Sequence, residues 1–250
     1  GTLSLGRTNS FFLGGGRAML NALYLTAEKL GVEIVYDGGV IDLQIEDGMF
    51  LSAKLKQPID GATDIRASAL VAAAGGFEAN IEWLKEYWGE AADNFLIRGT
   101  PYNRGSILRL LLDKGVQDIG DPTQCHAVAI DARAPKFDGG IITRHDSVVF
   151  GIVVNKHAQR FYDEGEDFWP KRYAIWGGLI ARQPGQVAYS IGDARAMGQF
   201  MPSVFPAVEA GSLREIAGTL GLDPAGLAAT VDAFNRSVRS GSFDPAGLDD

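Results

Sequence analysis

The chain has 250 residues, a formal net charge of −8 and a single cysteine, Cys125. An acidic chain disfavours unspecific binding to nucleic acid, and one cysteine excludes an intramolecular disulfide and a cysteine-rich metal site. The sequence contains no apolar run of about 18 residues or more, so we expect no direct membrane span. Sparse cysteine use fits a reducing compartment, and we expect a cytoplasmic protein with no nucleic-acid partner.

The hydrophobic pattern of residues 1–76 predicts an α/β domain with an inserted hairpin. Residues 14–31 open on three glycines and then repeat apolar side chains at helical spacing, which indicates a helix. Short apolar or alternating segments follow, and they indicate strands. These expected strands are residues 32–36, 40–45, 49–56 and 67–76. The order helix, strand, hairpin and strand fits a mixed sheet with helices.

Residues 77–240 predict a second domain of the α+β class, with residues 241–250 as a linker. The expected strands are residues 126–130, 148–154 and 186–191, and the expected helices are 78–89, 106–115, 212–221 and 223–241. Two of these helices carry clear starting signals. Ser212 and Glu215 form a capping box, and Asp223 is followed by Pro224 in the first turn.

Two glycine-rich stretches are candidates for ligand contact. Residues 14–16 precede a helix and could bind an anion, but the pattern is not G-x-G-x-x-G, and a plain glycine turn is favoured. The small residues 72–76 end an expected strand, where either a flat ligand or a packed helix could lie against the backbone. The three histidines do not have metal-ligand spacing, so no metal is proposed.

The most unusual stretch is VVNKHAQRFYDEGEDFWPKRY, which runs from Val153 to Tyr173. It reads either as a turn with a solvated acidic loop and a helix start, or as a loop that brings a cationic acid into an active site. It resembles a signature of the FAD-dependent fumarate reductase and succinate dehydrogenase flavoprotein superfamily, N-x-x-G-x-R-F-x-[ND]-E. The matching residues are Asn155, Arg160, Phe161, Asp163 and Glu164, with Ala158 in place of the glycine.

Three further stretches extend the resemblance over nearly the whole chain, and it is strongest to the tricarballylate dehydrogenase branch. They are residues 14–48, the segment ASALVAAAGGFEAN, and TQCHAVAI. The family's N-terminal G-x-G-x-x-G and its C-terminal glycine-rich segment have no counterpart here. The resemblance therefore implies an internal fragment: a partial FAD-binding domain in residues 1–76 and a substrate-capping domain in residues 77–240.

The resemblance also implies FAD as the cofactor of the complete protein. We expect the isolated chain to carry no FAD and to be inactive, because it lacks the pyrophosphate-binding element. The residues expected at the cofactor are Val40, Ala74, Gly75, Gly76, Asn103 and Arg104.

In such enzymes an arginine beyond the signature exchanges a proton with the substrate, opposite the flavin. The match has a register ambiguity, and Arg172 is the first choice and Lys171 the second. Carboxylates would relay or orient that proton, since a free guanidinium has a pKa above about 12. The expected carboxylates are Glu164, Glu166 and Asp167.

Substrates of this family carry two or three carboxylates, which require forked cationic donors or imidazoles. His126, Arg144 and His145 are the expected substrate-binding residues. The resemblance thus predicts an oxidoreductase that acts on a C–C bond of a polycarboxylate such as tricarballylate or fumarate, and it leaves open a membrane-associated electron-acceptor protein. The alternatives are a precorrin-oxidising flavoprotein of the sister branch and a non-catalytic capping domain.

Overall fold

A computed structural model describes residues 13–59, 61–137, 139–167, 169–242, 244 and 246–247. By their contacts these residues divide into two compact units. The hairpin unit contains the described residues up to Gly76 together with Gly105–Asp118. The signature unit contains Phe77–Arg104 and the described residues from Ile119 onward, and it includes the whole signature.

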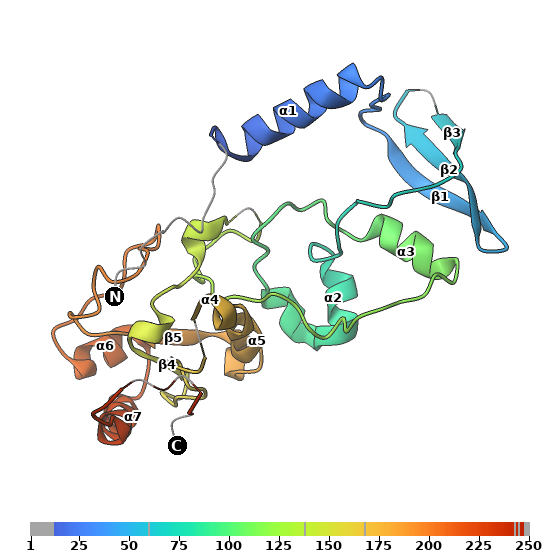
Figure 1. The fold of residues 1–250 in the computed structure, drawn as a ribbon. Helices are drawn as coiled ribbons and strands as arrows, with labels where there is room; N and C mark the ends of the chain where they lie inside the picture. Colours follow the sequence, from blue (N-terminus) through green and yellow to red (C-terminus); the bar gives the residue numbers. More distant parts are fainter. Residues whose placement is uncertain are drawn as a thin grey trace. The chain divides into compact units, whose positions relative to one another are not determined.

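The hairpin unit is built on a three-stranded antiparallel sheet in the order β1-β2-β3 (Figure 1). Its elements are α1 (Gly15–Lys29), β1 (Gly39–Glu46), β2 (Met49–Gln57), β3 (Gly61–Arg66) and α3 (Ser106–Asp113). Asp47 and Gly48 form the β1–β2 turn with φ angles of 49° and 76°. Positive φ at both turn residues is the geometry that Asp-Gly favours in a two-residue hairpin.

The sequence correctly predicted α1 and the hairpin but not the rest of this sheet. A mixed sheet was expected, but the observed sheet is antiparallel throughout, and its third strand, β3, was not predicted. Residues 32–36, 67–76 and 126–130 were expected to be strands, but they are irregular in the structure apart from an isolated bridge between Ile130 and Arg144. A strand needs a neighbour that pairs with its main chain. No strand ladder among the described residues includes these segments.

Helix α3 lies in the hairpin unit, although residues 105–118 were expected to belong to the second domain, 77–240. The helix packs against β1. Lys114 Nζ lies 3.1 Å from a carboxylate oxygen of Asp42 on that strand. The chain therefore changes from one unit to the other after Gly76, after Arg104 and after Asp118.

The signature unit contains short helices and a two-stranded antiparallel sheet (Figure 1). Its α-helices and strands are α2 (Ile81–Trp88), β4 (Ile152–Asn155), α4 (Trp169–Arg172), α5 (Trp176–Ala181), β5 (Ala188–Ile191), α6 (Leu213–Leu220) and α7 (Pro224–Ser237). Its 3-10 helices are η1 (Gly89–Asn94), η2 (Ile141–Thr143), η3 (Val148–Phe150), η4 (Tyr173–Ile175) and η5 (Pro184–Gln186).

Strand β4 lies at the centre of this unit and buries both of its faces. Ile152 and Val154 join a cluster with Ala217 and Leu227 of α6 and α7. Because successive side chains of a strand alternate between faces, Val153 points to the opposite side. There it packs with a cluster that contains Trp176 of α5. The strand thus joins the terminal helices to the segment that follows the signature.

The expected caps of the two terminal helices are confirmed. The Ser212 hydroxyl accepts a hydrogen bond from the backbone N–H of Glu215, and the Asp223 carboxylate accepts two from Ala225 and Gly226. Each cap satisfies N–H groups that have no partner within the helix. Helices α6 and α7 pack against each other, and Leu222, in the short link that connects them, is buried.

Candidate functional site

The signature begins with a tight turn that fixes the direction of the following loop. The side-chain oxygen of Asn155 accepts hydrogen bonds from the backbone N–H groups of His157 and Gln159. Ala158 is fully buried and has a φ of 58°. This left-handed conformation favours glycine, which explains why the family signature has glycine at the position that Ala158 occupies.

Arg160 and Glu164 of the signature form a buried ion pair. The Arg160 guanidinium donates to Glu164 at 2.6 and 2.7 Å, and the Glu164 carboxylate also accepts the Val153 N–H at 2.5 Å. The Arg160 guanidinium lies over the Phe234 ring of α7, 5.1 Å from the ring centroid. Burial raises the pKa of the Glu164 carboxyl, against the opposing effect of these hydrogen bonds. The pair joins the loop to β4 and α7.

A second arginine–glutamate pair follows, and it includes a tyrosine. The Arg172 guanidinium donates to the Tyr162 hydroxyl at 2.9 Å and to the Glu166 carboxylate. The Tyr162 hydroxyl donates to that same carboxylate. Hydrogen bonds from Tyr162 and Arg172 lower the pKa of Glu166, and the Glu166 carboxylate raises the pKa of Arg172. Glu166 was one of three expected carboxylates, and Tyr162 was not among the expected residues.

The two residues named beside this cluster lie apart from it. Lys171 Nζ bonds Asp167 at 2.7 Å, and the Lys171 side chain is 73% exposed. The Glu164 carboxylate contacts Arg160 and the Val153 N–H. Glu166 is an expected carboxylate that contacts Arg172.

Tyr173 brings two of the expected substrate residues together. The His126 ring meets the Tyr173 ring edge to face, with centroids 5.2 Å apart. The Arg144 guanidinium lies 4.6 Å from the centroid of the same ring. Arg144 is also held by Asp146 through contacts of 2.8 Å. Tyr173 follows Arg172 directly, so the chain places this group next to the Tyr162–Glu166–Arg172 cluster.

Close backbone packing holds His126 beside Tyr173. The Ala127 N–H donates to the Ala174 carbonyl at 2.9 Å, and the Gly177 N–H donates to the Ala127 carbonyl at 2.8 Å. A Cβ at Gly177 would lie 2.6 Å from the Ala127 carbonyl carbon. Only glycine permits this approach, so Gly177 determines where residues 126 and 127 lie.

His145 belongs to a different network. Its Nε2 lies 3.5 Å from Asp131, which Arg133 engages through two hydrogen bonds of 2.7 and 2.8 Å. Burial lowers the pKa of His145, and the nearby Asp131 only partly offsets this effect. Burial thus favours the neutral imidazole.

The expected cofactor residues fall in both units. Val40 lies in β1, while Ala74 and Gly75 are exposed in irregular backbone that continues to Gly76. These small side chains leave the main chain open, which fits a flat ring system lying along it. Asn103 and Arg104 instead contact residues 78 and 79: Asn103 Nδ2 donates to Glu78 at 2.6 Å, and Arg104 donates to the Ala79 carbonyl at 3.4 Å.

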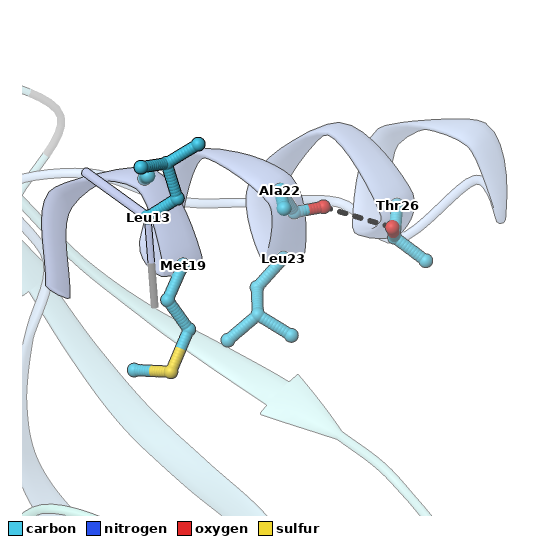
Figure 2. A pocket seen from close by; sticks show the side chains of 6 residues that line it. Leu13, Met19, Ala22, Leu23 and Thr26 are labelled. Carbon is cyan, nitrogen blue, oxygen red and sulfur yellow. Dashed lines mark hydrogen bonds between the residues drawn. The ribbon is translucent and has the colours of Figure 1, made fainter. Parts of the chain in front are cut away.

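A shallow groove along α1 does not have the character of a catalytic site. Met19 and Leu23 project from one side of the helix, and the Thr26 hydroxyl bonds the Ala22 carbonyl of its own helix at 2.8 Å (Figure 2). Leu13 and Ala18 complete the lining, so the groove offers no charged group. Within the described part of the chain, no group of three metal-binding side chains occurs, and no helix could cross a membrane.

Comparison with known proteins gives relatives at low identity. An NADH:acrylate oxidoreductase of Vibrio harveyi is 26% identical over 92% of this chain and 23% of the relative. An NADH:fumarate oxidoreductase of Klebsiella pneumoniae is 24% identical over 89% and 24%. A 3-oxosteroid 1-dehydrogenase of Mycobacterium tuberculosis is 25% identical over 94% and 45%. The chain thus spans less than half the length of each of these curated relatives.

Two solved structures share the fold. A flavocytochrome c3 fumarate reductase in an open conformation matches 92% of this chain and 41% of its own, with a TM-score of 0.59 and 20% identity. The 3-ketosteroid Δ1-dehydrogenase of Sterolibacterium denitrificans matches 89% and 43%, with a TM-score of 0.65 and 19% identity. The likeness concerns the fold alone at these identities.

The family comparison covers nearly the whole chain. A family described as FAD binding domain matches residues 5–246. This match agrees with the signature at 155–164 and with relatives that are oxidoreductases. The chain therefore belongs to the FAD binding domain family, in the fumarate reductase and succinate dehydrogenase flavoprotein superfamily.

Proposed function

We propose that this chain is part of a flavin-dependent oxidoreductase that dehydrogenates or reduces a C–C bond of a small polycarboxylate, such as tricarballylate or fumarate. One observation carries the proposal. Arg172 is held by Tyr162 and Glu166, and the next residue, Tyr173, contacts both His126 and Arg144. The residues expected to donate the proton and to bind carboxylates thus belong to one unit of the chain.

The chemistry divides between the cofactor and the protein. FAD, when bound, supplies hydride transfer at one carbon of the bond. Arg172 exchanges the proton of the neighbouring carbon, and Glu166 is its proton partner. A guanidinium is a poor acid, and the contact with Glu166 raises the pKa of Arg172 further, so the proposed exchange needs a carboxylate in direct contact to share the proton. Tyr162 bridges the two groups and holds their geometry.

The substrate class follows from the charges beside the proton donor. Arg144 and His126 provide a guanidinium and an imidazole, the donors that suit carboxylates. Acrylate and fumarate, which appear in the names of two relatives, are both unsaturated carboxylates. A 3-oxosteroid, named for the third, has no carboxylate for these donors to bind. A compact polycarboxylate is therefore favoured over a steroid or a macrocycle.

A substrate panel on the FAD-loaded full-length protein tests the proposal. Tricarballylate and succinate would be supplied with an artificial electron acceptor, and fumarate and acrylate with reduced flavin or NADH. We expect turnover of at least one di- or tricarboxylate and none of a 3-oxosteroid. Turnover of the steroid alone, with no reaction of any carboxylate, would refute the proposal.

A further inference from the structure

Three segments that are distant in the sequence meet at Tyr173. The Ala127 N–H donates to the Ala174 carbonyl at 2.9 Å, and the His145 N–H donates to the Ala129 carbonyl at 2.9 Å. Main-chain hydrogen bonds therefore tie the segment that carries the expected substrate histidine to the segment of the expected substrate arginine and to the tyrosine. The place of the tyrosine beside these two donors is set by the backbone.

The Tyr173 ring contacts both of these donors. Its centroid lies 5.2 Å from the His126 ring centroid and 4.6 Å from the guanidinium carbon of Arg144. Because both distances are measured to the same ring, the two donors cannot lie farther apart than these distances together. His126 is exposed, and the Arg144 side chain is 18% exposed. One aromatic side chain thus holds an imidazole and a guanidinium near each other, where a ligand can reach them.

Two partners fix the orientation of Arg144. Its Nε lies 2.8 Å from one carboxylate oxygen of Asp146, and its Nη2 donates to the other at 2.8 Å. Among the residues that the structure describes, the third nitrogen, Nη1, has no hydrogen-bond acceptor. Asp146 thus holds one edge of the guanidinium and Tyr173 covers its face. The Nη1 end is the donor that remains for a ligand.

We propose that Tyr173 is a positioning residue, which directs Arg144 and His126 toward the same carboxylate substrate and thereby sets its affinity. This proposal deepens the proposed function and rests on it. A ring face attracts a cation, and a packed ring restricts the rotamers of the side chains that it contacts. Neither effect needs the hydroxyl group, so phenylalanine serves as well as tyrosine. Tyr173 acts through the two donors and does not itself exchange the proton.

Citrate is a suitable probe of this role because it carries three carboxylates and its binding can be measured without turnover. Isothermal titration would compare the FAD-loaded full-length protein with its Tyr173→Leu and Tyr173→Phe variants. We expect Tyr173→Leu to weaken citrate binding by about tenfold and Tyr173→Phe to leave it within about twofold. In turnover of the carboxylate that the substrate panel identifies, Tyr173→Leu should raise KM by a similar factor and leave kcat nearly unchanged.

The matched control is Phe205→Leu. The Phe205 ring makes a similar contact with an arginine, 4.9 Å from the guanidinium carbon of Arg133, but it has no part in the Tyr173 group. Citrate affinity of this variant should stay within about twofold of the wild type. An equal loss in Phe205→Leu, or an equal loss in Tyr173→Phe, would overturn the proposal, as would wild-type affinity in Tyr173→Leu.

A double-mutant cycle with Arg144→Gln separates positioning from damage to the fold. If Tyr173 acts through Arg144, the loss of citrate affinity in the double variant is smaller than the product of the two single losses. A variant that damaged the fold would lose affinity in both backgrounds alike, so losses that multiply would overturn the proposal.

The same measurements distinguish this proposal from the proposed function. Citrate binding that depends on the Tyr173 ring, in a protein that turns over no carboxylate, would refute the proposed function and leave the positioning role in an anion site standing. Turnover of a carboxylate with a KM that Tyr173→Leu does not change would overturn the positioning role alone.

Discussion

The segment from Arg160 to Arg172 contains two arginine–glutamate pairs that differ in their surroundings. The Arg160–Glu164 pair has side-chain exposures of 19% and 3%, and it binds the main chain of β4 and the Phe234 ring. The Arg172–Glu166 pair has exposures of 27% and 24%, and its third member is a tyrosine hydroxyl. The first pair is tied to the main chain of the core, whereas the second is the pair to which the proposed function assigns the proton exchange. Similar residue pairs therefore have different roles according to what surrounds them.

The largest expected effect on stability comes from Glu164→Ala. The change leaves the Val153 N–H buried without its acceptor, removes the 2.6 Å ion-pair partner of Arg160 and opens a cavity. We expect a loss of about 3 kcal/mol in the free energy of unfolding, measured by urea denaturation. Glu166→Ala is the matched control and should cost no more than about 1 kcal/mol. Equal losses for the two variants would erase the distinction between the pairs.

Tyr162→Phe should have a smaller effect, and it should fall on turnover. The variant keeps the ring but removes the hydroxyl that joins Arg172 to Glu166. We expect kcat to fall by about tenfold, since a hydrogen bond to a charged group contributes about 1.5 kcal/mol or more. KM and the melting temperature should change little. A variant with normal kcat but lower stability would assign Tyr162 to the fold instead.

The smallest expected effect is a difference in the pH dependence of stability. The pKa of Glu164 is raised above its ordinary value of 4.5, so its contribution to stability falls as pH rises from 4.5 through the folded-state pKa. The pKa of Glu166 is lowered from 4.5, so its contribution is present above 4.5 and is lost as pH falls through the folded-state pKa. The free energy of unfolding in urea would be measured across this pH range for the wild type and for Glu164→Gln and Glu166→Gln. We expect the slope of that free energy against pH to differ from the wild-type slope in opposite directions for the two variants. Parallel slopes would contradict the assignment.

The sequence predicted the parts of the fold that depend on local chemistry. Asp47 and Gly48 indicated the hairpin turn, and Ser212 and Asp223 indicated the starts of α6 and α7. Residues 67–76 and 126–130 were wrongly expected to be strands, because apolar composition does not reveal whether a pairing partner exists. Local pattern thus determines caps and turns, whereas strand pairing depends on distant segments.

The candidate site was predicted only in part for the same reason. The sequence could name Arg172 and a set of acids, but only the fold distinguishes Glu166, which contacts Arg172, from Glu164, which contacts β4. No feature of the sequence separates Tyr162 from the other aromatic residues near it. Burial and long-range contacts, which no short pattern encodes, separate these roles.

Anaerobic single-turnover reduction of the flavin tests the central claim most directly, that Arg172 carries the proton. The FAD-loaded full-length protein and its Arg172→Ala and Arg172→Lys variants would be mixed with tricarballylate, or with the carboxylate that the substrate panel identifies. We predict that both variants retain FAD and that flavin reduction slows by about 100-fold or more, because a general acid or base is lost and lysine lacks the planar fork. Flavin reduction at a near-normal rate in Arg172→Ala would contradict the account.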